Sequence, residues 1–143
     1  APSYEPNWSP DGTQIAFLGH TGGVGDVFVL TLADGAIVQL TDNGIDGDWD
    51  PDWSPDGTQI AFTSERAGND DIFIMDADGG NVRQLTFSDA DDAFPAWSPD
   101  GSQIAFLSRR AGGWEVFVAQ ADGSFVQQIT FTGGGKMGVD WLR

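Results

Sequence analysis

Residues 53–62 read WSPDGTQIAF, the same ten letters stand at 8–17, and 97–106 differ from them only by Ser102 in place of threonine. The tryptophans that open these copies, together with Trp141 near the end of the chain, are spaced by 45, 44 and 44 residues. A threonine follows each of the first three tryptophans at a distance of 33 residues: Thr41, Thr86 and Thr130. Such fixed spacing indicates that one supersecondary unit occurs three times.

Each repeat contains four short segments rich in β-branched and aromatic residues, which is typical of strands. In the second repeat these segments are DPDW (50–53), QIAF (59–62), DIFIM (71–75) and the stretch that ends at Thr86. A Ser-Pro-Asp-Gly turn precedes the second segment, and an Asp-Gly turn separates the third from the fourth. We expect the aspartate of the first turn to cap it in each copy: Asp11, Asp56 and Asp100.

Four strands in about 40–45 residues predict a blade of a β-propeller. We therefore expect an all-β fold with three four-stranded blades and a C-terminal stub that repeats only a first strand. The expected bounds are 3–41, 48–86 and 92–130 for the blades and 137–143 for the stub. Apolar residues occupy both faces of the strands, as the consecutive Ile60, Ala61 and Phe62 show, so each blade should pack between two neighbours.

The string P-x-W-S-P-D-G-x-x-I-A-F, followed by Arg-x-Gly, an F-V/I strand, an A-D-G turn and Q-L/I-T, resembles the TolB-type, WD-repeat-like propeller blade. The match extends over essentially the whole chain. The resemblance implies a ring of six blades, a non-enzymatic role, and binding of partner protein segments at the channel mouth. It also implies a periplasmic or extracellular location. Similar blades occur in the propellers of prolyl-oligopeptidase-like peptidases and in carbohydrate-active proteins, so the fold alone assigns no function.

Three blades do not close a ring, because closed propellers have about four to eight. A row of three would leave an apolar face open at each end. A homodimer would supply six blades in a closed two-chain ring; alternatively, the chain is part of a longer one. In the dimer, the stub at 138–142 could complete the partner's first blade, in competition with that partner's residues 4–8, and the sequence does not decide between them. The chain begins with Ala1, so either a leader was removed or the sequence comes from something longer.

The chain carries 22 acidic and six basic side chains, for a net charge of −16. This charge argues against nucleic acid or an anionic membrane as a partner, since both need a basic surface. It favours a cation or a basic protein or peptide. The absence of cysteine excludes disulfides, cysteine zinc sites and thiol catalysis.

The most acidic stretch, residues 46–52, alternates carboxylates as the start of a calcium loop does, although Pro51 and Gly57 stand where that loop needs glycine and glutamate. It is either a solvated acidic rim or a Ca²⁺ site. The candidate metal ligands are Asp46, Asp48 and Asp50. The candidate partner-binding acids are Asp48, Asp50, Asp52, Asp92 and Asp140. Asp92 aligns with Asp48, and Asp52 aligns with Asn7 and Asp140, so that repetition around a ring would collect negative charge near one mouth.

Arg109, Arg110 and Trp114 form a candidate anchor patch, although Trp114 could instead pack on the next blade. The recurring Arg66 and Arg110 should link blades or loops. His20 has no partner pattern for catalysis, and we predict no catalytic residue. The leading hypothesis is a non-enzymatic, self-assembling scaffold that binds protein or peptide at an acidic channel mouth. The alternatives are a fragment of a larger hydrolase or lyase that contains a propeller, or an engineered or amplified repeat fragment whose property is self-assembly.

Overall fold

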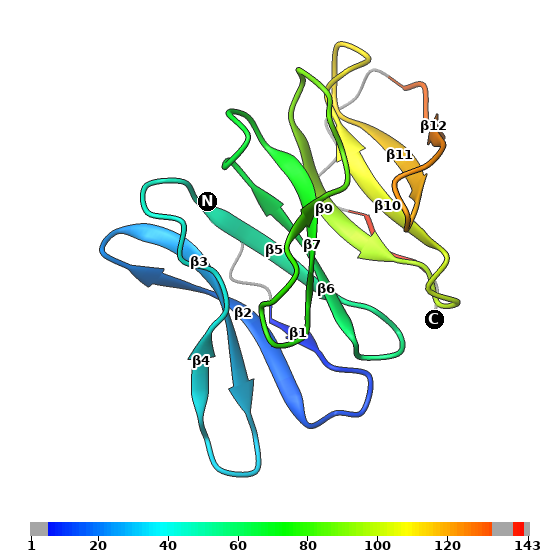
Figure 1. Ribbon diagram of the computed structural model, residues 1–143. Coiled ribbons are helices and arrows are strands. Elements are labelled where there is room, and N and C mark those ends of the chain that lie inside the picture. The colour runs from blue at the N-terminus through cyan, green and yellow to red at the C-terminus, as the bar shows by residue number, and fades with distance from the viewer. Residues whose placement is uncertain (1–5, 133–138, 142–143) are drawn as a thin grey trace.

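The computed structural model of the chain describes residues 6–132 and 139–141. These residues form three four-stranded antiparallel sheets, which are arranged as three successive blades (Figure 1). Within each sheet the strands follow one another in chain order. The all-β fold and the three four-stranded units predicted from the repeat are therefore confirmed. No helix in the described part of the chain could span a membrane.

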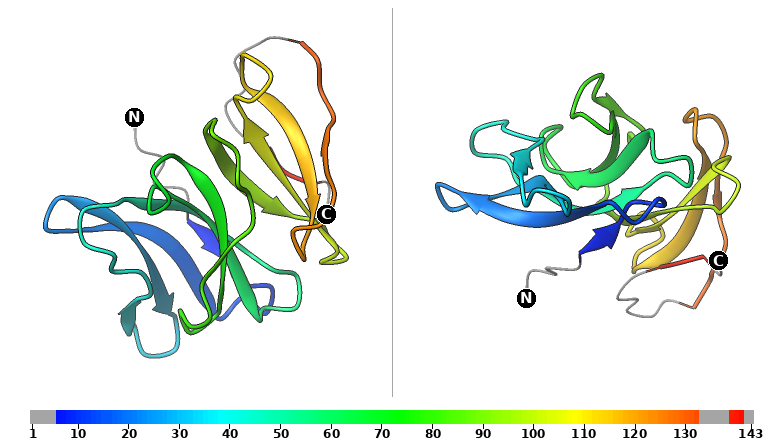
Figure 2. Two further views of the ribbon diagram at one scale, coloured as in Figure 1. Left: turned by 45° about the horizontal axis from the view of Figure 1, so that its top comes forward. Right: turned by 90° about the horizontal axis from the view of Figure 1, so that it is seen from below.

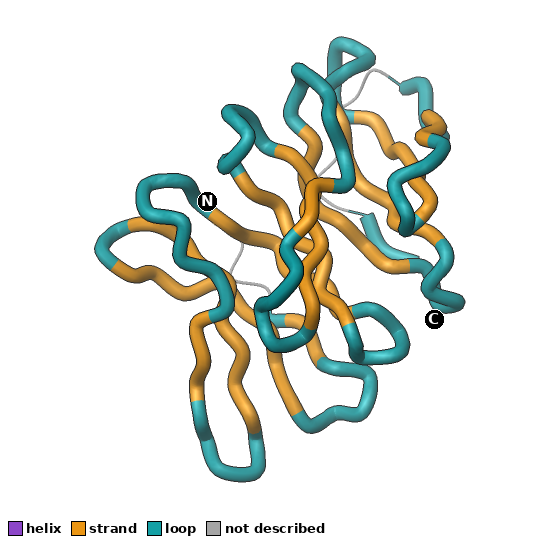
Figure 3. The backbone as a smooth tube through the Cα atoms, viewed as in Figure 1, coloured by secondary structure: helices purple, strands orange, loops and turns teal. Residues whose placement is uncertain are grey.

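The strands of corresponding position recur from blade to blade, as the coloured tube in Figure 3 shows. Blade 1 consists of β1 (Asn7–Trp8), β2 (Gln14–Thr21), β3 (Val24–Thr31) and β4 (Ile37–Gln39). Blade 2 consists of β5 (Asp48–Trp53), β6 (Gln59–Ser64), β7 (Asp71–Asp76) and β8 (Arg83–Gln84). Blade 3 consists of β9 (Asp92–Trp97), β10 (Gln103–Ser108), β11 (Glu115–Gln120) and β12 (Val126–Gln128).

The Ser-Pro-Asp-Gly turns are held by the aspartates that the sequence predicts as caps. In blade 2, Ser54 Oγ donates to the Asp56 carboxylate at 2.7 Å, and the Thr58 backbone N–H donates to the same oxygen at 3.0 Å. The Asp11 and Asp100 turns repeat both bonds. Gly57 follows at a positive φ of 72°, which an L side chain rarely adopts. These contacts explain why the turn sequence recurs almost unchanged.

Two apolar cores lie between the blades rather than within them. The first joins Val27 and Val29 of blade 1 to Trp53 and Phe62 of blade 2. The second joins residues of blade 2 to Trp97 and other residues of blade 3. Because blade 2 contributes one face to each core, both of its faces are covered. This arrangement is the reason for the apolar residues at consecutive positions of β6 and β7.

The two outer flanks of the row stay open, as the two views in Figure 2 illustrate. Trp53 and Trp97 are only 3 % and 5 % exposed, whereas the corresponding Trp8 is 53 % exposed. At the other end, Ile129 is 49 % exposed, although Leu85, which holds the same position in blade 2, is 1 % exposed. The sequence predicts all the recurring tryptophans as core residues, and the difference at Trp8 arises because no sheet covers its face of blade 1 in this chain.

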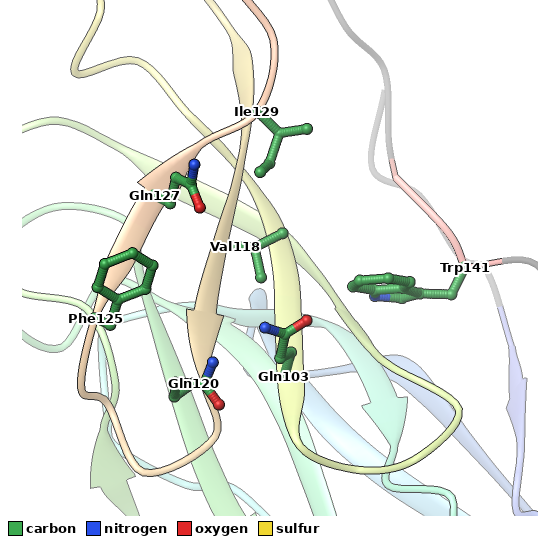
Figure 4. A pocket seen from close by; sticks show the side chains of 7 residues that line it. All are labelled: Gln103, Val118, Gln120, Phe125, Gln127, Ile129 and Trp141. Atoms are coloured by element: carbon green, nitrogen blue, oxygen red, sulfur yellow. The ribbon is translucent and has the colours of Figure 1, made fainter.

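Trp141 lies against the open flank of blade 3. It lines a pocket together with Gln103, Val118 and Ile129, as Figure 4 shows. Its indole N–H donates to the backbone carbonyl of Ala96 at 3.0 Å. The rest of the predicted stub, residues 137–138 and 142–143, lies outside the described residues. Trp141 thus packs against the face of blade 3 in a place comparable to the one that Trp97, from the first strand of blade 3, takes against the face of blade 2.

Candidate functional site

The variable connections of the repeat lie at one end of the sheets, which we call the loop end. In an antiparallel sheet the connection from the second to the third strand and the connection from the fourth strand to the next sheet lie at the same end. The contacts confirm this for blade 2, since Arg66 of the β6–β7 connection contacts Asp48 at the start of β5. The Ser-Pro-Asp-Gly turns lie at the opposite end.

A buried ion pair recurs at the loop end of blades 2 and 3. In blade 2, the Arg66 guanidinium donates to both oxygens of Asp48 at 3.0 and 2.9 Å and to Ser64 Oγ at 2.8 Å. In blade 3, Arg110 donates to Asp92 at 2.6 Å and to Ser108 Oγ at 2.8 Å. Both aspartate side chains are fully buried. The arginines therefore supply the charge that these buried carboxylates need.

The same two arginines also lie over aromatic rings. The guanidinium carbon of Arg66 is 5.2 and 5.1 Å from the ring centres of Phe62 and Phe73. Arg110 lies 5.7 and 4.8 Å from the equivalent Phe106 and Phe117. The rings of each phenylalanine pair are opposite each other on adjacent strands. Each arginine lies in the connection between the second and third strands of its blade. It thus links that connection to the first strand and to the phenylalanine pair of the same blade.

The threonine that ends each repeat has a structural role that the spacing alone does not reveal. Thr86 Oγ accepts the backbone N–H of Ile72 at 2.9 Å and donates to Asp71 at 3.0 Å. Thr130 accepts from Val116 in the same way and donates to Glu115. Thr41 accepts the backbone N–H of Val27 at 3.0 Å. A signal was present in the sequence, since in every repeat an acidic residue directly precedes the third-strand residue whose N–H the threonine accepts: Asp26, Asp71 and Glu115.

Burial raises the pKa of several aspartates at the loop end. It raises the pKa of Asp70 to about 6, and the neighbouring charges of Asp91 and Glu65 add to the effect. Burial likewise raises the pKa of Asp71 to about 6, although the hydrogen bond from Thr86 opposes it. The pKa of Asp92 is also raised by burial, against the opposing hydrogen bond from Ser108 and charge of Arg110. These groups favour the neutral form more than ordinary surface aspartates do.

Several candidate binding residues make contacts within the fold. Asp52 accepts a hydrogen bond from the Trp97 backbone N–H at 2.7 Å and another from Asn7 Nδ2 at 2.8 Å. Asp50 has a positive φ of 53° in an irregular part of β5 and accepts from Thr63 Oγ at 3.3 Å. Asp140 is exposed and accepts the backbone N–H of Trp141 at 2.7 Å.

The predicted anchor patch is partly assembled. The Arg109 guanidinium lies 5.3 Å from the ring centre of Trp114, and Arg109 also pairs with Asp91 at 3.3 Å on an exposed surface. Arg110, the next residue, points instead to the buried Asp92. The sequence predicts that Arg66 and Arg110 link blades or loops, and in the structure each joins a hairpin connection to the first strand of the same blade.

The three candidate calcium ligands are not brought together as a metal centre. Asp48 contacts Arg66, and Asp50 contacts Thr63. Over residues 6–132 and 139–141, no group of three or more His, Asp or Glu side chains is placed to hold a metal ion. The calcium hypothesis stays a prediction.

The repeated sheets, the caps and the inter-blade cores define a β-propeller segment, and comparison with known proteins identifies its family. The profile of the TolB beta propeller domain matches residues 1–142, so the chain belongs to that family. No curated relative matches the chain at a significant level.

Solved structures agree with this assignment. A putative TolB from Agrobacterium tumefaciens is 33 % identical with a TM-score of 0.81, over 90 % of this chain and 49 % of that one. TolB from Acinetobacter baumannii is 29 % identical with a TM-score of 0.77, over 87 % of this chain and 31 % of that one. The chain thus spans half or less of these relatives. A puromycin-hydrolyzing peptidase from Mycobacterium tuberculosis shares the fold at 17 % identity and a TM-score of 0.76, over 94 % of this chain and 24 % of that one.

Proposed function

We propose that this chain is a non-enzymatic propeller scaffold that closes a ring with a second copy and binds a protein or peptide segment at its loop end. The observation that supports the proposal is the pair of open flanks. Trp8 on one flank and Ile129 on the other are about half exposed. The residues at the same positions of the repeat between the blades, Trp53 and Leu85, are buried. Burial of apolar surface stabilises association by roughly 25 cal/mol per Å².

The number of blades agrees with a dimer. Two rows of three blades give six, which lies within the usual range of about four to eight for closed propellers. Blade 3 of each copy would pack on blade 1 of the other, so the two junctions would be equivalent under a two-fold axis. The first strand of blade 1 could then be β1 of the same copy or the strand that contains Trp141 of the other.

Size-exclusion chromatography with light scattering tests ring closure. The expected mass is twice the 15.2 kDa of one chain. Ile129→Lys should shift the particle toward the monomer, because it places a charge in the junction. Val38→Lys is the matched control and should stay dimeric, because Val38 is exposed on β4 and pairs with Val29, on the face of blade 1 that already packs on blade 2. A stable, well-folded monomer of the unaltered chain would contradict ring closure.

The binding role rests on charge. With a net charge of −16, the chain attracts cations and basic segments, and a ring would focus that field at its mouth. Family resemblance supports a periplasmic or extracellular location and binding of protein segments. Titration with a labelled polylysine peptide at low and high salt tests this role. Binding that weakens with salt is expected, and no binding at low salt would contradict it.

A second candidate function is a propeller segment of a larger hydrolase or lyase. Its support is the partial coverage of longer proteins, including the puromycin-hydrolyzing peptidase. In that case further blades of the same polypeptide would cover the flanks, and this chain alone would have no turnover. A parent reading frame that also encodes a Ser-His-Asp domain would favour this alternative over the scaffold.

A further inference from the structure

The three most exposed large apolar side chains in the described part of the chain all lie in the same element of the repeat. Ile45 is 89 % exposed, Phe87 is 77 % exposed and Phe131 is 78 % exposed. Each follows the threonine that ends its repeat, in or at the start of the connection toward the next tryptophan. All three therefore lie at the loop end, one for each blade, and we call them the apolar row.

Missing neighbours do not explain the exposure of Ile45 and Phe87. The connection with Ile45 leads from blade 1 to blade 2, and the connection with Phe87 leads from blade 2 to blade 3, so both lie beside a blade that is present (Figure 1). Trp8 and the other exposed residues of the open flanks differ from Ile45 and Phe87, because a further blade packed on the flank would cover them. Ring closure would thus leave Ile45 and Phe87 exposed.

The connection that carries Phe87 is held in place by the structure around it. Asn69 Nδ2 donates to the carbonyls of Ser88 and Ala90, each at 3.2 Å, and the Asp92 N–H donates to the Asp70 carbonyl at 2.7 Å. The connection with Ile45 is joined to the β6–β7 connection by a bond from the Glu65 N–H to the Gly47 carbonyl at 3.1 Å. An apolar side chain on a fixed backbone binds with less loss of conformational entropy than one on a mobile loop.

The charges beside the apolar row determine what it can bind. Asp42 and Asp46 stand on either side of Ile45, and Asp89 and Asp91 follow Phe87 in the same connection. Among these acids, Asp91 is paired with Arg109 at 3.3 Å on an exposed surface. Anionic membranes and nucleic acids would be repelled by this surface. A protein segment with both apolar and basic side chains would be complementary to this surface, its apolar side chains to the apolar row and its basic side chains to the neighbouring aspartates.

We propose that the apolar row of Ile45, Phe87 and Phe131 is a docking surface for a protein segment that alternates apolar with basic side chains. This inference rests on the proposed binding function and specifies its anchor residues. Apolar side chains of the partner would pack on the row, and its lysines or arginines would face Asp42, Asp46 and Asp89. Because the row contributes one anchor per blade, the partner would lie across the connections of successive blades.

Fluorescence anisotropy with three labelled synthetic peptides of equal length tests the proposal on the full chain. One peptide alternates Lys with Phe, the second alternates Lys with Ser, and the third alternates Glu with Phe. The Lys/Phe peptide should bind at least about tenfold more tightly than the Lys/Ser peptide, since burial of an aromatic anchor commonly contributes more than a tenfold change in affinity. The Glu/Phe peptide should bind more weakly than both.

Two variants locate the binding surface. Ile45→Ser and Phe87→Ser should each weaken binding of the Lys/Phe peptide by at least about fivefold, the usual threshold for an energetically important contact. Ile37→Ser is the matched control, because Ile37 is an exposed isoleucine of the same blade that lies on β4 rather than at the loop end. It should leave binding unchanged. All variants replace exposed side chains, so folding should be retained, and circular dichroism verifies this.

The outcomes separate this inference from the broader proposal. If the Lys/Phe and Lys/Ser peptides bind equally and the row variants change nothing, the apolar docking surface is overturned while charge-driven binding stands. If no peptide binds at low salt, both are overturned. Light scattering on the same samples shows whether ring closure has failed independently. Loss of Lys/Phe binding in both row variants, but not in Ile37→Ser, supports the docking surface.

Discussion

The carboxylate of Asp52 accepts a hydrogen bond from the Trp97 backbone N–H at 2.7 Å, and this bond links the inner strand of blade 2 to that of blade 3. The same carboxylate accepts from Asn7 Nδ2 of blade 1 at 2.8 Å. The buried Asp52 side chain, which belongs to the first strand of blade 2, therefore joins that strand to the first strands of blades 1 and 3. In blade 3, Ala96 holds the position equivalent to Asp52 and cannot make such a contact.

We expect Asp52→Ala to lower the free energy of unfolding by about 2 kcal/mol, because it leaves the Trp97 N–H without this acceptor in a buried place. Asp52→Asn should lose less, since its amide oxygen can still accept from Trp97. Urea unfolding monitored by tryptophan fluorescence measures both. Asp89→Ala, in an exposed part of the connection between blades 2 and 3, is the control and should change little. Equal stability of Asp52→Ala and the unaltered chain would contradict the assigned role.

The adjacent Arg109 and Arg110 allow a comparison of a surface ion pair with a buried one. Arg110 pairs with the fully buried Asp92, whereas Arg109 pairs with the partly exposed Asp91. Arg110→Ala leaves a buried carboxylate without its cation, which should cost about 3 kcal/mol at neutral pH. Arg109→Ala should cost about 1 kcal/mol or less, because water already screens the pair. Thermal unfolding measures both, and equal losses would show that the burial of Asp92 does not determine the effect.

Arg66→Lys tests the geometry of the recurring ion pair. Lysine keeps the positive charge near Asp48 but cannot donate from a planar fork to that carboxylate and to Ser64 Oγ together. It also loses the planar group that lies over Phe62. We expect Arg66→Lys to be less stable than the unaltered chain, by about 1–2 kcal/mol, and more stable than Arg66→Ala. Full stability of the lysine variant in urea would show that charge alone is required.

Sequence periodicity was sufficient to predict the sheets and their turns. The tryptophan and threonine spacing places four strands in each repeat, and the Asp56 cap follows from turn chemistry that acts over only a few residues. Packing between blades followed from the apolar residues on both faces of the strands. These features depend on local propensity and on a pattern that occurs three times, so they can be read without coordinates.

The partners of the loop-end acids could not be predicted in this way. Asp48 and Arg66 are 18 residues apart, and only the pairing of β5 with β6 brings the two ends together. Asp52 and Trp97 belong to different blades, so their contact depends on how the sheets pack. The sequence therefore identifies the acids as candidates for binding, while the fold shows that several of them have partners inside the protein. The apolar row was missed because the first repeat breaks its pattern: Phe87 and Phe131 directly follow the threonine, whereas Ile45 stands four positions after Thr41.

The calcium hypothesis for Asp46, Asp48 and Asp50 predicts a higher Tm in calcium chloride than in a chelator, because a ligand that binds only the native state stabilises it. Asp46→Asn and Asp50→Asn should reduce that difference. Arg66→Ala should increase calcium affinity, since it removes the cation that contacts Asp48. Asp34→Asn is a control for the loss of one acidic charge. An identical Tm with calcium and with chelator would exclude the metal.

Stability should fall as the pH rises from about 4 to about 6. The folded-state pKa of Asp70 and of Asp71 is raised to about 6 from 3.8, so in this range the native state binds more protons than the unfolded state. Stability then decreases with rising pH. Below this range the sign reverses, because hydrogen bonds from Ser102 and Ser98 lower the pKa of Asp100 to about 2, and its contribution is lost as the pH falls.

The variant Asp70→Asn distinguishes the contribution of Asp70 to the pH dependence of stability from that of Asp71. Asp70 Oδ1 is buried and accepts no hydrogen bond within the described residues, so ionisation at neutral pH opposes folding there. The variant should be more stable at pH 7 by about 1 kcal/mol, which is less than the full effect of the raised pKa because the side chain is only partly buried. The gain should shrink as the pH approaches 4, where Asp70 is protonated in the native state. Chemical unfolding across this range measures both effects, and a gain that does not depend on pH would show that charge burial is not its cause.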